Sequence, residues 1–565
     1  MVDSGSFARN VYDFSNDTFR VVKSSFGPNG LDCMVSTTSG TLLVTNNGFQ
    51  ILKSLCSPSP NISPAGRLVF RGLESFYKST GDFSKKFSLL TRELLFEVMD
   101  VFQCAQATPR QDFVAIAQEM DCVLVNVFPK LLSELTKLNI VIDITEDIEK
   151  TALSIIRTNL NGKFSPKTCE QLTNILRKIL FENQTKIDLL ELKSKTAMLV
   201  DKFTEIFWEV PGRPLSSSAV LPGIVIPRPF VTLLKQLPSK STGSSFKFIV
   251  LCACLGYDLP KTKTVLMLNE SQKVKAMLQW RSRFIEGFIQ QFVNNGVALI
   301  ISSKTLHETV IHCCNQSGLA AIESVPQEDI QRLCAIFGIN PLFELELQED
   351  WSYFIGEASL CKSIGVGQHA HVHLEPAKVL TKQVLLYAPS QPMCRQYSVA
   401  LQNALKSLRN AFQDQKTGVP SLSVVSGGGV FELGLALALE RYRVENKVKS
   451  KVELACHILE KALLSIPRQL LENSGRGTSV CNVYARARQS LTSGKKLLGI
   501  NKNGTLSELV REGVLEPVLG NYEMVSSVVQ LFAQIMKTDQ VIHVRKLPRN
   551  NELENNHDDS EHVSF

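Results

Sequence analysis

The stretch Phe26-Gly27-Pro28-Asn29-Gly30-Leu31-Asp32 is the first of three glycine-bearing turns that dominate the functional interpretation of this chain. Thr45-Asn46-Asn47-Gly48 forms the second turn, and Thr80-Gly81-Asp82 forms the third. Glycine lets backbone N–H groups approach phosphate oxygens, and a nearby carboxylate can hold Mg²⁺. Each turn alone is a common loop signal, so the prediction of a phosphate site rests on all of them together. A fourth candidate, Gly427-Gly428-Gly429, precedes a predicted apolar helix whose N-terminus would favour anions.

The composition is that of an ordinary globular protein. The chain has 565 residues, of which 44% are hydrophobic and 20% charged, and this length predicts roughly three to four domains. A formal charge of +7, from 61 Lys and Arg against 54 Asp and Glu, does not indicate nucleic-acid binding. No apolar run approaches the roughly 18 residues that cross a bilayer, so no membrane insertion is predicted. The absence of a signal-peptide pattern and of disulfide spacing among the 14 cysteines predicts a cytoplasmic location.

Hydrophobic periodicity predicts helices towards both ends of the chain and alternating helices and strands in the middle. The expected helices cover residues 14–26, much of 112–195, 280–295, 398–412, 430–438 and 524–536. The expected strands cover residues 32–37, 41–46, 246–255, 297–302 and 541–545. The alternation between 209 and 345 indicates an α/β domain.

In order and spacing, the turns resemble the equatorial ATP site of group II chaperonins, the family of the eukaryotic cytosolic chaperonin and the archaeal thermosome. The likeness continues in residues 426–432, in Ile466-Pro467-Arg468, in residues 513–517 and in residues 538–542. It covers about residues 10 to 546. The resemblance therefore implies a fold as well as a site.

The implied fold is an α/β multidomain, chaperonin-like one, with a largely helical split equatorial domain, a split intermediate domain and an α/β apical domain. The expected boundaries are 1–110 (equatorial), 111–208 (intermediate), 209–345 (apical), 346–397 (intermediate), 398–548 (equatorial) and 549–565 (a disordered acidic tail). ATP and Mg²⁺ are the cofactors that the resemblance implies. The expected nucleotide-binding residues are Gly27, Pro28, Gly30, Asn47, Gly48, Gly81, Asp82, Ser84, Lys85, Gly427, Gly428 and Gly429, with Asp82 on the metal side.

Several positions depart from the family pattern. Asn47 and Asn403 stand where the family has aspartates, and Phe83 stands where it has a glycine. An amide cannot act as a general base and adds no negative charge to a Mg²⁺ site. General-base assistance contributes about 10²–10⁴-fold, so hydrolysis is predicted to be weak or lost. Lys85 and Lys86 either pair with phosphate or form a solvated helix face.

Within the family, the chain resembles the divergent chaperonin-like Bardet–Biedl syndrome proteins. The stretches that carry this likeness are residues 520–530, 541–545, 299–303 and 336–341. The resemblance implies a role in assembling the BBSome, with cytosolic chaperonin subunits and sibling chaperonin-like Bardet–Biedl proteins as partners and BBSome subunits as clients. It also implies a location in the cytoplasm, at the ciliary base or in the cilium.

Two other functions remain open at this stage. The first is an ATP-hydrolysing folding chaperonin subunit. The second is a metal-dependent enzyme, because His369, His371 and His373 alternate and would share one strand face. With Cys361 they resemble a zinc ligand set, but an ordinary polar strand face is the favoured interpretation. Zinc is therefore not expected.

Overall fold

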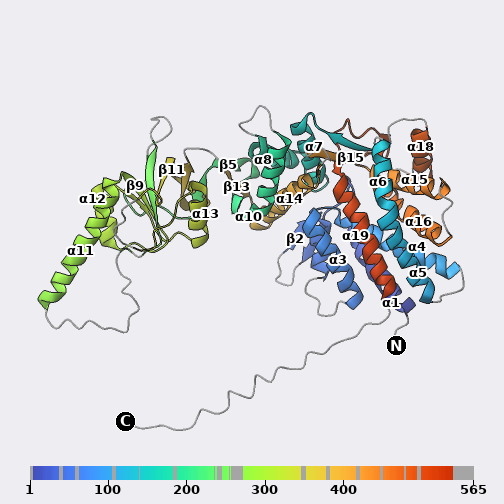
Figure 1. The fold of residues 1–565 in the computed structure, drawn as a ribbon, viewed down its shortest axis with the longest axis horizontal. Coiled ribbons are helices and arrows are strands. Elements are labelled where there is room, and N and C mark those ends of the chain that lie inside the picture. Colours follow the sequence, from blue (N-terminus) through green and yellow to red (C-terminus); the bar gives the residue numbers. More distant parts are fainter. Residues whose placement is uncertain are drawn as a thin grey trace, which may run out of the picture.

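The computed structural model is elongated, with helices from both chain ends at one end and a mixed sheet at the other (Figure 1). It describes residues 4–36, 42–56, 63–104, 110–138, 140–181, 188–234, 236–237, 245–253, 255, 271–344, 351–376, 382–414, 420–445, 450–475, 479–492 and 498–538. The predicted strand at 541–545 and the predicted tail at 549–565 lie outside these residues. No described helix is both long and apolar enough to cross a bilayer.

The helices of the two chain ends share one hydrophobic core. They are α1 (Ser4–Lys23), α2 (Gly48–Cys56), α3 (Pro64–Thr80), α4 (Ser84–Cys104), α5 (Arg110–Cys122), α6 (Phe128–Lys137), α15 (Val430–Glu445), α16 (Ser450–Leu463), α17 (Ser465–Asn473), α18 (Val480–Thr492) and α19 (Val518–Lys537). A π-helical turn, Val123–Val127, joins α5 to α6. Short hairpins are formed by β1 (Cys33–Ser36) with β2 (Leu42–Thr45) and by β16 (Gly499–Ile500) with β17 (Leu506–Ser507).

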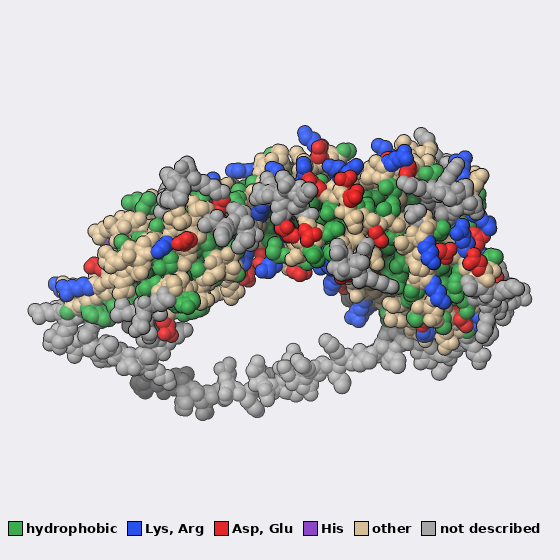
Figure 2. Space-filling model, turned by 45° about the horizontal axis from the view of Figure 1, so that its top comes forward, with side chains coloured by type: hydrophobic (Ala, Val, Ile, Leu, Met, Phe, Trp, Pro, Cys, Tyr) green, Lys and Arg blue, Asp and Glu red, His purple; other side chains and the backbone are tan. Residues whose placement is uncertain are grey.

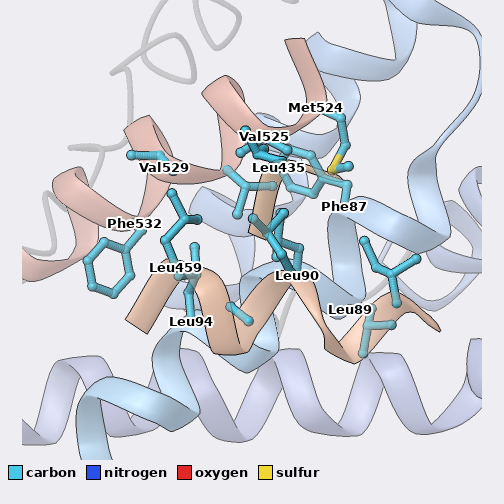
Figure 3. Close-up of a cluster of buried hydrophobic side chains, with 14 of the residues drawn as sticks. Phe87, Leu89, Leu90, Leu94, Leu435, Leu459, Met524, Val525, Val529 and Phe532 are labelled. Carbon is cyan, nitrogen blue, oxygen red and sulfur yellow. The ribbon is translucent and has the colours of Figure 1, made fainter. Parts of the chain in front are cut away.

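The centre of this core lies on α4, which packs against both α16 and α19. Figure 3 shows Phe87 and Leu90 of α4 gathered with Leu459 of α16 and with Met524 and Val525 of α19. All of these side chains are at most 1% exposed. Burial of each such side chain contributes about 1.5–3 kcal/mol, so residues from opposite ends of the sequence stabilise the same body.

A second core lies between the helical end and the far sheet. Its elements are α7 (Ile148–Leu160), α8 (Pro166–Phe181), α9 (Leu189–Asp201), α10 (Phe203–Ile206), the 3₁₀ turn Leu215–Ser217, α14 (Gln391–Arg409), and the strands β4 (Phe207–Pro211), β5 (Ala219–Pro222) and β13 (Lys382–Ala388). β13 pairs parallel to β4 and antiparallel to β5. A further sheet, made of β3 (Val141–Ile144), β14 (Phe412–Asp414), β15 (Pro420–Ser426) and β18 (Leu515–Pro517), connects this core to the helical end.

The far body is a sheet with helices on both faces. Its strands are β6 (Ile224–Ile226), β7 (Gln236–Leu237), β8 (Phe246–Leu251), β9 (Val297–Ser302), β10 (Ala320–Ile322), β11 (Ile355–Val366) and β12 (His369–Pro376), and its helices are α11 (Ser271–Asn294), α12 (Glu308–Ser317) and α13 (Gln327–Phe337). Along β8, Phe248 packs on the side of α13, whereas Ile249 packs on the side of α11 and α12. This alternation, with period two, explains the continuous apolar run of a strand that is buried on both faces.

The structure confirms the α/β multidomain fold class and most predicted elements, and it corrects several bounds. β9 has the predicted limits 297–302, while α1 begins ten residues before the predicted start. The strand predicted over 246–255 ends at Leu251, and the helix predicted over 398–412 runs from Gln391 to Arg409. The mostly helical interval 112–195 also contains β3. We attribute this miss to tertiary pairing, because β3 is held by β15 from far along the chain.

Candidate functional site

A cavity of about 790 Å³ lies where the glycine-bearing turns meet, within the size range of small-molecule sites. The predicted residues that line it are Gly27, Pro28, Gly30, Asn47, Gly48, Asp82, Ser84, Lys85, Gly428 and Gly429. Gly81 and Gly427 are described but do not contribute to its wall. The structure therefore brings most of the predicted site residues to one place.

The first turn is held by polar contacts from both ends of the chain. Asn473, at the end of α17, donates a hydrogen bond from Nδ2 to the carbonyl of Phe26 (2.8 Å). Asn46 of the second turn donates to the carbonyl of Gly30 (3.1 Å). Gly30 cannot carry a side chain, because a Cβ there would lie 2.3 Å from the carbonyl oxygen of Ser25. These contacts fix the first two turns against each other.

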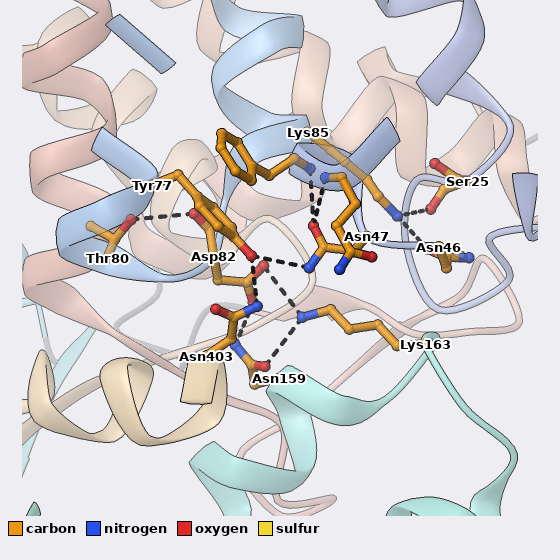
Figure 4. A network of polar contacts seen from close by, with 12 residues as sticks. Ser25, Asn46, Asn47, Tyr77, Thr80, Asp82, Lys85, Asn159, Lys163 and Asn403 are labelled. Carbon is orange, nitrogen blue, oxygen red and sulfur yellow. Dashed lines mark hydrogen bonds and ion pairs between the residues drawn. The ribbon is translucent and has the colours of Figure 1, made fainter. Parts of the chain in front are cut away.

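Asn47 and Asn403, the two amides that the resemblance places at aspartate positions, meet at Tyr77. Oδ1 of Asn47 accepts hydrogen bonds from the backbone N–H groups of Phe49 (3.0 Å) and Gln50 (3.3 Å), at the start of α2. Its Nδ2 donates to the hydroxyl of Tyr77 (3.0 Å). Nδ2 of Asn403, on α14, donates to the same hydroxyl (2.7 Å). Figure 4 shows the phenol between the two amides.

The third turn places Asp82 between two side chains that the sequence did not single out. Gly81 ends α3 with a φ of 75°, and its N–H donates to the carbonyl of Tyr77 (2.8 Å). Asn159 of α7 donates to Oδ2 of Asp82 (2.7 Å), and Nζ of Lys163 lies 3.6 Å from Oδ1. Lys163 also donates to Oδ1 of Asn159 (3.1 Å). Both oxygens of the Asp82 carboxylate therefore have partners.

Phe83 takes a backbone conformation that glycine would adopt more readily. Its φ is 64°, a left-handed value that costs an ordinary residue about 1–2 kcal/mol. The ring is 8% exposed and packs against α19, where a Cβ on Gly520 would lie 2.7 Å from Cε2 of Phe83. Burial of the ring offsets the backbone strain.

Lys85 reaches across the cavity wall and is not part of a solvated helix face. Its Nζ donates to the carbonyl of Ser25 and to Oδ1 of Asn46, so it joins the first turn to the second. A Cβ on Gly48 would lie 2.5 Å from Cγ of Lys85, which shows how closely the lysine crosses the second turn. Burial, followed by the charge of Lys163, lowers the pKa of Lys85 to about 7.

Lys86 is buried in an ion-pair network, which also contradicts the solvated-face interpretation. Its Nζ lies 2.9 Å from Glu432 and 2.7 Å from Glu516, and it donates to Oδ1 of Asn521 (3.1 Å). Burial by itself lowers the pKa of Lys86, but the two carboxylates outweigh burial and raise it. Because both carboxylates already contact this ammonium, Lys86 is committed to holding α4, α15 and β18 together.

These contacts do not fit a tightly held Mg²⁺ ion. Such an ion takes oxygen ligands, usually one or two carboxylates with water and phosphate. Asp82, the predicted metal ligand, is paired with Lys163 and hydrogen-bonded to Asn159. The side-chain oxygen of Asn47, Oδ1, already accepts a hydrogen bond from the N–H group of Phe49 at the start of α2. The turns and lysines of the cavity remain compatible with an anionic ligand.

The three alternating histidines do not form a polar strand face. His369 is exposed, but His371 and His373 are 7% and 2% exposed, so that expectation is wrong for two of the three. Nδ1 of His371 lies 2.9 Å from the carbonyl of His369, and Nε2 of His373 lies 2.6 Å from the carbonyl of Pro222. Among the described residues, which include Cys361, no group of three or more His, Cys, Asp or Glu could hold a metal ion.

Charged side chains of both signs are interspersed over the helical end of the molecule in the view of Figure 2. Among the residues that the structure describes, no broad field of Lys and Arg alone is seen on this face. A surface that binds nucleic acid usually carries a basic patch or stripe.

Comparisons with known proteins agree with this architecture. The sequence model described as the TCP-1/cpn60 chaperonin family matches residues 19–546. The thermosome subunit alpha of Archaeoglobus fulgidus is 23% identical over 532 residues, covering 94% of this chain and 90% of that protein. The thermosome subunit alpha of Aeropyrum pernix is 24% identical over 528 residues, covering 92% of this chain and 88% of that protein. Because the family match spans most of the chain, the protein belongs to the TCP-1/cpn60 chaperonin family and, within it, to the group II chaperonins.

Proposed function

We propose that this protein assists the folding and assembly of other proteins through protein contacts, and that its nucleotide site hydrolyses ATP weakly or not at all. The proposal of weak or absent hydrolysis rests on one observation: Asn47 and Asn403 both donate a hydrogen bond to the phenol of Tyr77. Neither amide can accept a proton from an attacking water. Loss of general-base assistance alone lowers turnover by about 10²–10⁴-fold.

The cavity is proposed to bind the phosphates of ATP through the glycine-bearing turns. Ten predicted residues that line the cavity are the proposed contacts: Gly27, Pro28, Gly30, Asn47, Gly48, Asp82, Ser84, Lys85, Gly428 and Gly429. Gly81 and Gly427, which were predicted with them, lie next to contact residues but outside the cavity wall. Backbone N–H groups in such turns bind phosphate oxygens, and Lys85 adds a cation at the same wall. Asp82 would hold Mg²⁺ only after releasing Lys163, so weak metal binding is part of the proposal.

The domain layout of the family is proposed for this chain with the boundaries 110/111, 208/209, 345/346, 397/398 and 548/549. Separate hydrophobic cores support a division into three bodies: the helical end, the middle body and the far sheet. Two of the boundaries do not coincide with these cores. The boundary 110/111 falls within α5, whose side chains pack into the core of the helical end, and 397/398 falls within α14, which packs into the middle body. A protein of this layout would present the far sheet and its helix α11 to clients. They lie at the opposite end of the molecule from the helical end (Figure 1), whose turns line the cavity.

The proposed clients are the subunits of the BBSome. This finer role rests on the likeness of residues 520–530, 299–303 and 336–341 to chaperonin-like Bardet–Biedl proteins, and most of all to the Bardet–Biedl syndrome 10 protein. Cytosolic chaperonin subunits and sibling chaperonin-like proteins are the proposed partners. The proposed location is the cytoplasm, including the ciliary base.

The test is affinity purification of the tagged full-length protein from ciliated cells, with partners identified by mass spectrometry. Recovery of cytosolic chaperonin subunits together with sibling chaperonin-like proteins is the expected result. Recovery of a ring of this chain alone with diverse unfolded clients would overturn the assembly role and favour an independent folding chaperonin.

ATP turnover of the purified protein tests the other half of the proposal. We expect turnover close to background, and no further loss in an Asp82→Ala variant. Turnover that Asp82→Ala abolishes would show that the protein is an ATP-hydrolysing chaperonin subunit.

A further inference from the structure

We infer that Tyr77 joins Asn47 and Asn403 into a single hydrogen-bonded unit. This unit tolerates an aspartate at either position, but not aspartates at both positions together. The link that this inference makes to ATP hydrolysis rests on the proposed function and deepens it. Tyr77 acts here as a positioning residue, because it holds two side chains whose identity decides whether the site can activate water. Its place in the sequence, one turn before Gly81 in the helix α3, gives no sign of this role.

The orientation of Asn47 is fixed from outside the unit. Its Oδ1 accepts the N–H groups of Phe49 (3.0 Å) and Gln50 (3.3 Å), so its Nδ2 must face the Tyr77 hydroxyl (3.0 Å). Asn403 approaches the same oxygen to 2.7 Å. The phenol oxygen therefore bridges the two side chains.

The ring of Tyr77 is held firmly in this position. It is 8% exposed and stacks on Phe49, with centroids 4.1 Å apart and an interplanar angle of 14°. Phe49 stacks in turn on Phe70 at 6.1 Å. Asn403 is 2% exposed and, unlike Asn47, does not line the described cavity. Tyr77 and Asn403 thus lie behind the cavity wall that Asn47 forms.

The proton count of the phenol sets the limit on carboxylates. A phenol hydroxyl has one proton to donate and can accept two hydrogen bonds. With aspartate at position 47 or 403, the phenol donates to the new carboxylate while the remaining amide still donates to the phenol. With aspartate at both positions, the phenol can donate its one proton to only one carboxylate. The other carboxylate then faces the phenol oxygen with no hydrogen between them, and two like charges are buried together.

The experiment is a double-variant cycle on the full-length chain, with melting temperature and urea midpoint measured at pH 8 and pH 5. The variants are Asn47→Asp, Asn403→Asp and the pair. The matched control pair is Asn47→Asp with Asn161→Asp, because Asn161 also lines the cavity but is exposed. We expect the control pair to be additive. At pH 8, the Asn47→Asp/Asn403→Asp pair is expected to lose more stability than the two single shifts together.

The excess loss should shrink at pH 5, because protonating one carboxylate supplies the missing donor. A purely structural defect would not respond to pH in this way. The charged groups near the unit are Asp82, Lys163, Lys85, Lys406 and Arg409. Of these, Lys85 titrates in the same interval. Their contribution is removed by comparing each variant with the wild type and the control pair at the same pH.

The outcomes separate this inference from the proposed function. An additive pair at pH 8, an excess loss unchanged at pH 5, or a pair that is unfolded at both pH values would overturn the inference. So would a folded Asn47→Asp/Asn403→Asp variant that gains ATP turnover over the wild type, because Tyr77 should still lie between the two side chains. Wild-type turnover that Asp82→Ala abolishes would instead overturn the proposed function, whatever the cycle shows.

Discussion

The ammonium nitrogen of Lys163 lies 3.6 Å from a carboxylate oxygen of Asp82, so the acidic side chain on which a Mg²⁺ site would depend already has a cationic partner. Asn159 donates to the other oxygen at 2.7 Å. A divalent cation at Asp82 would have to displace the ammonium group. Next to Asp82, an anionic ligand in the cavity would therefore meet the ammonium group of Lys163 in place of a metal ion.

This pairing predicts that nucleotide binding depends little on Mg²⁺. We expect the ATP affinity of the wild type to change by less than about tenfold, or ~1.4 kcal/mol, when Mg²⁺ is replaced by EDTA. Lys163→Met leaves Asp82 open to the metal, so its affinity should depend more strongly on Mg²⁺. Isothermal titration at constant ionic strength measures both. Lys502→Met, at another lysine of the cavity wall, is the control, and complete loss of wild-type binding in EDTA would contradict the prediction.

The buried hydroxyl of Tyr77 predicts that removing this one oxygen atom lowers the stability of the protein. Tyr77→Phe removes the acceptor of the Asn403 amide, which is 2% exposed. Leaving a buried donor unsatisfied costs about 1–3 kcal/mol, so the urea midpoint should fall. Tyr353→Phe is the control, because Tyr353 is 66% exposed and surface changes are usually within about 0.5 kcal/mol. Equal midpoints for the two variants would argue against the contact.

The lowered pKa of Lys85 predicts a pH-dependent contribution to stability. Burial brings the folded-state pKa to about 7, against an ordinary value of 10.5. Between these values the unfolded chain binds a proton that the folded chain has lost, so stability rises with pH. Below about pH 7 both states are protonated, and the full desolvation cost of the charge remains.

Lys85→Met isolates this effect in urea unfolding at pH 6, 7.5 and 9. The free energy of unfolding of the wild type minus that of the variant should increase with pH, by at most about 1.4 kcal/mol per pH unit. The exposed Lys502 provides the control variant, Lys502→Met, whose difference from the wild type should be flat. A flat difference for Lys85→Met would mean that its ammonium stays charged.

The sequence was sufficient for elements whose burial pattern is local. The strand at 297–302 was predicted with its observed limits because its apolar run is short and follows the glycine that ends a helix. β3 was missed because its four residues are held by β15, far along the chain. The long helix α14 was predicted to start late because Gln391 and Pro392 carry no apolar period of their own.

The candidate site could be predicted where glycine marks a backbone requirement, as at Gly30 and Gly48. It could not be predicted where tertiary packing supplies the partner. Asn159 and Lys163 reach Asp82 because α7 packs beside the third turn, and Tyr77 meets Asn403 because α14 does. Polar residues on a helix face look alike in the sequence, whether they face solvent or a buried carboxylate.

The buried pairs of Lys86 predict the largest effect of a single substitution in this region. Lys86→Met would leave Glu432, 0% exposed, and Glu516 without their shared cation. Removing one partner of a buried ion pair costs about 3–5 kcal/mol. Adding Glu432→Gln removes one of the two orphaned charges, so the double variant should be more stable than Lys86→Met alone.

The control for this prediction is Lys78→Met, at a lysine whose ion pair with Glu74 is largely exposed and should contribute about 0–1 kcal/mol. Urea unfolding at pH 8 measures all three variants. The loss in Lys86→Met should lessen at pH 5, because two uncompensated carboxylates that lie close together hold a proton more readily than separate ones. Equal losses for Lys86→Met and Lys78→Met would mean that the network does not join α4 to α15 and β18, and that the lysine is solvated after all.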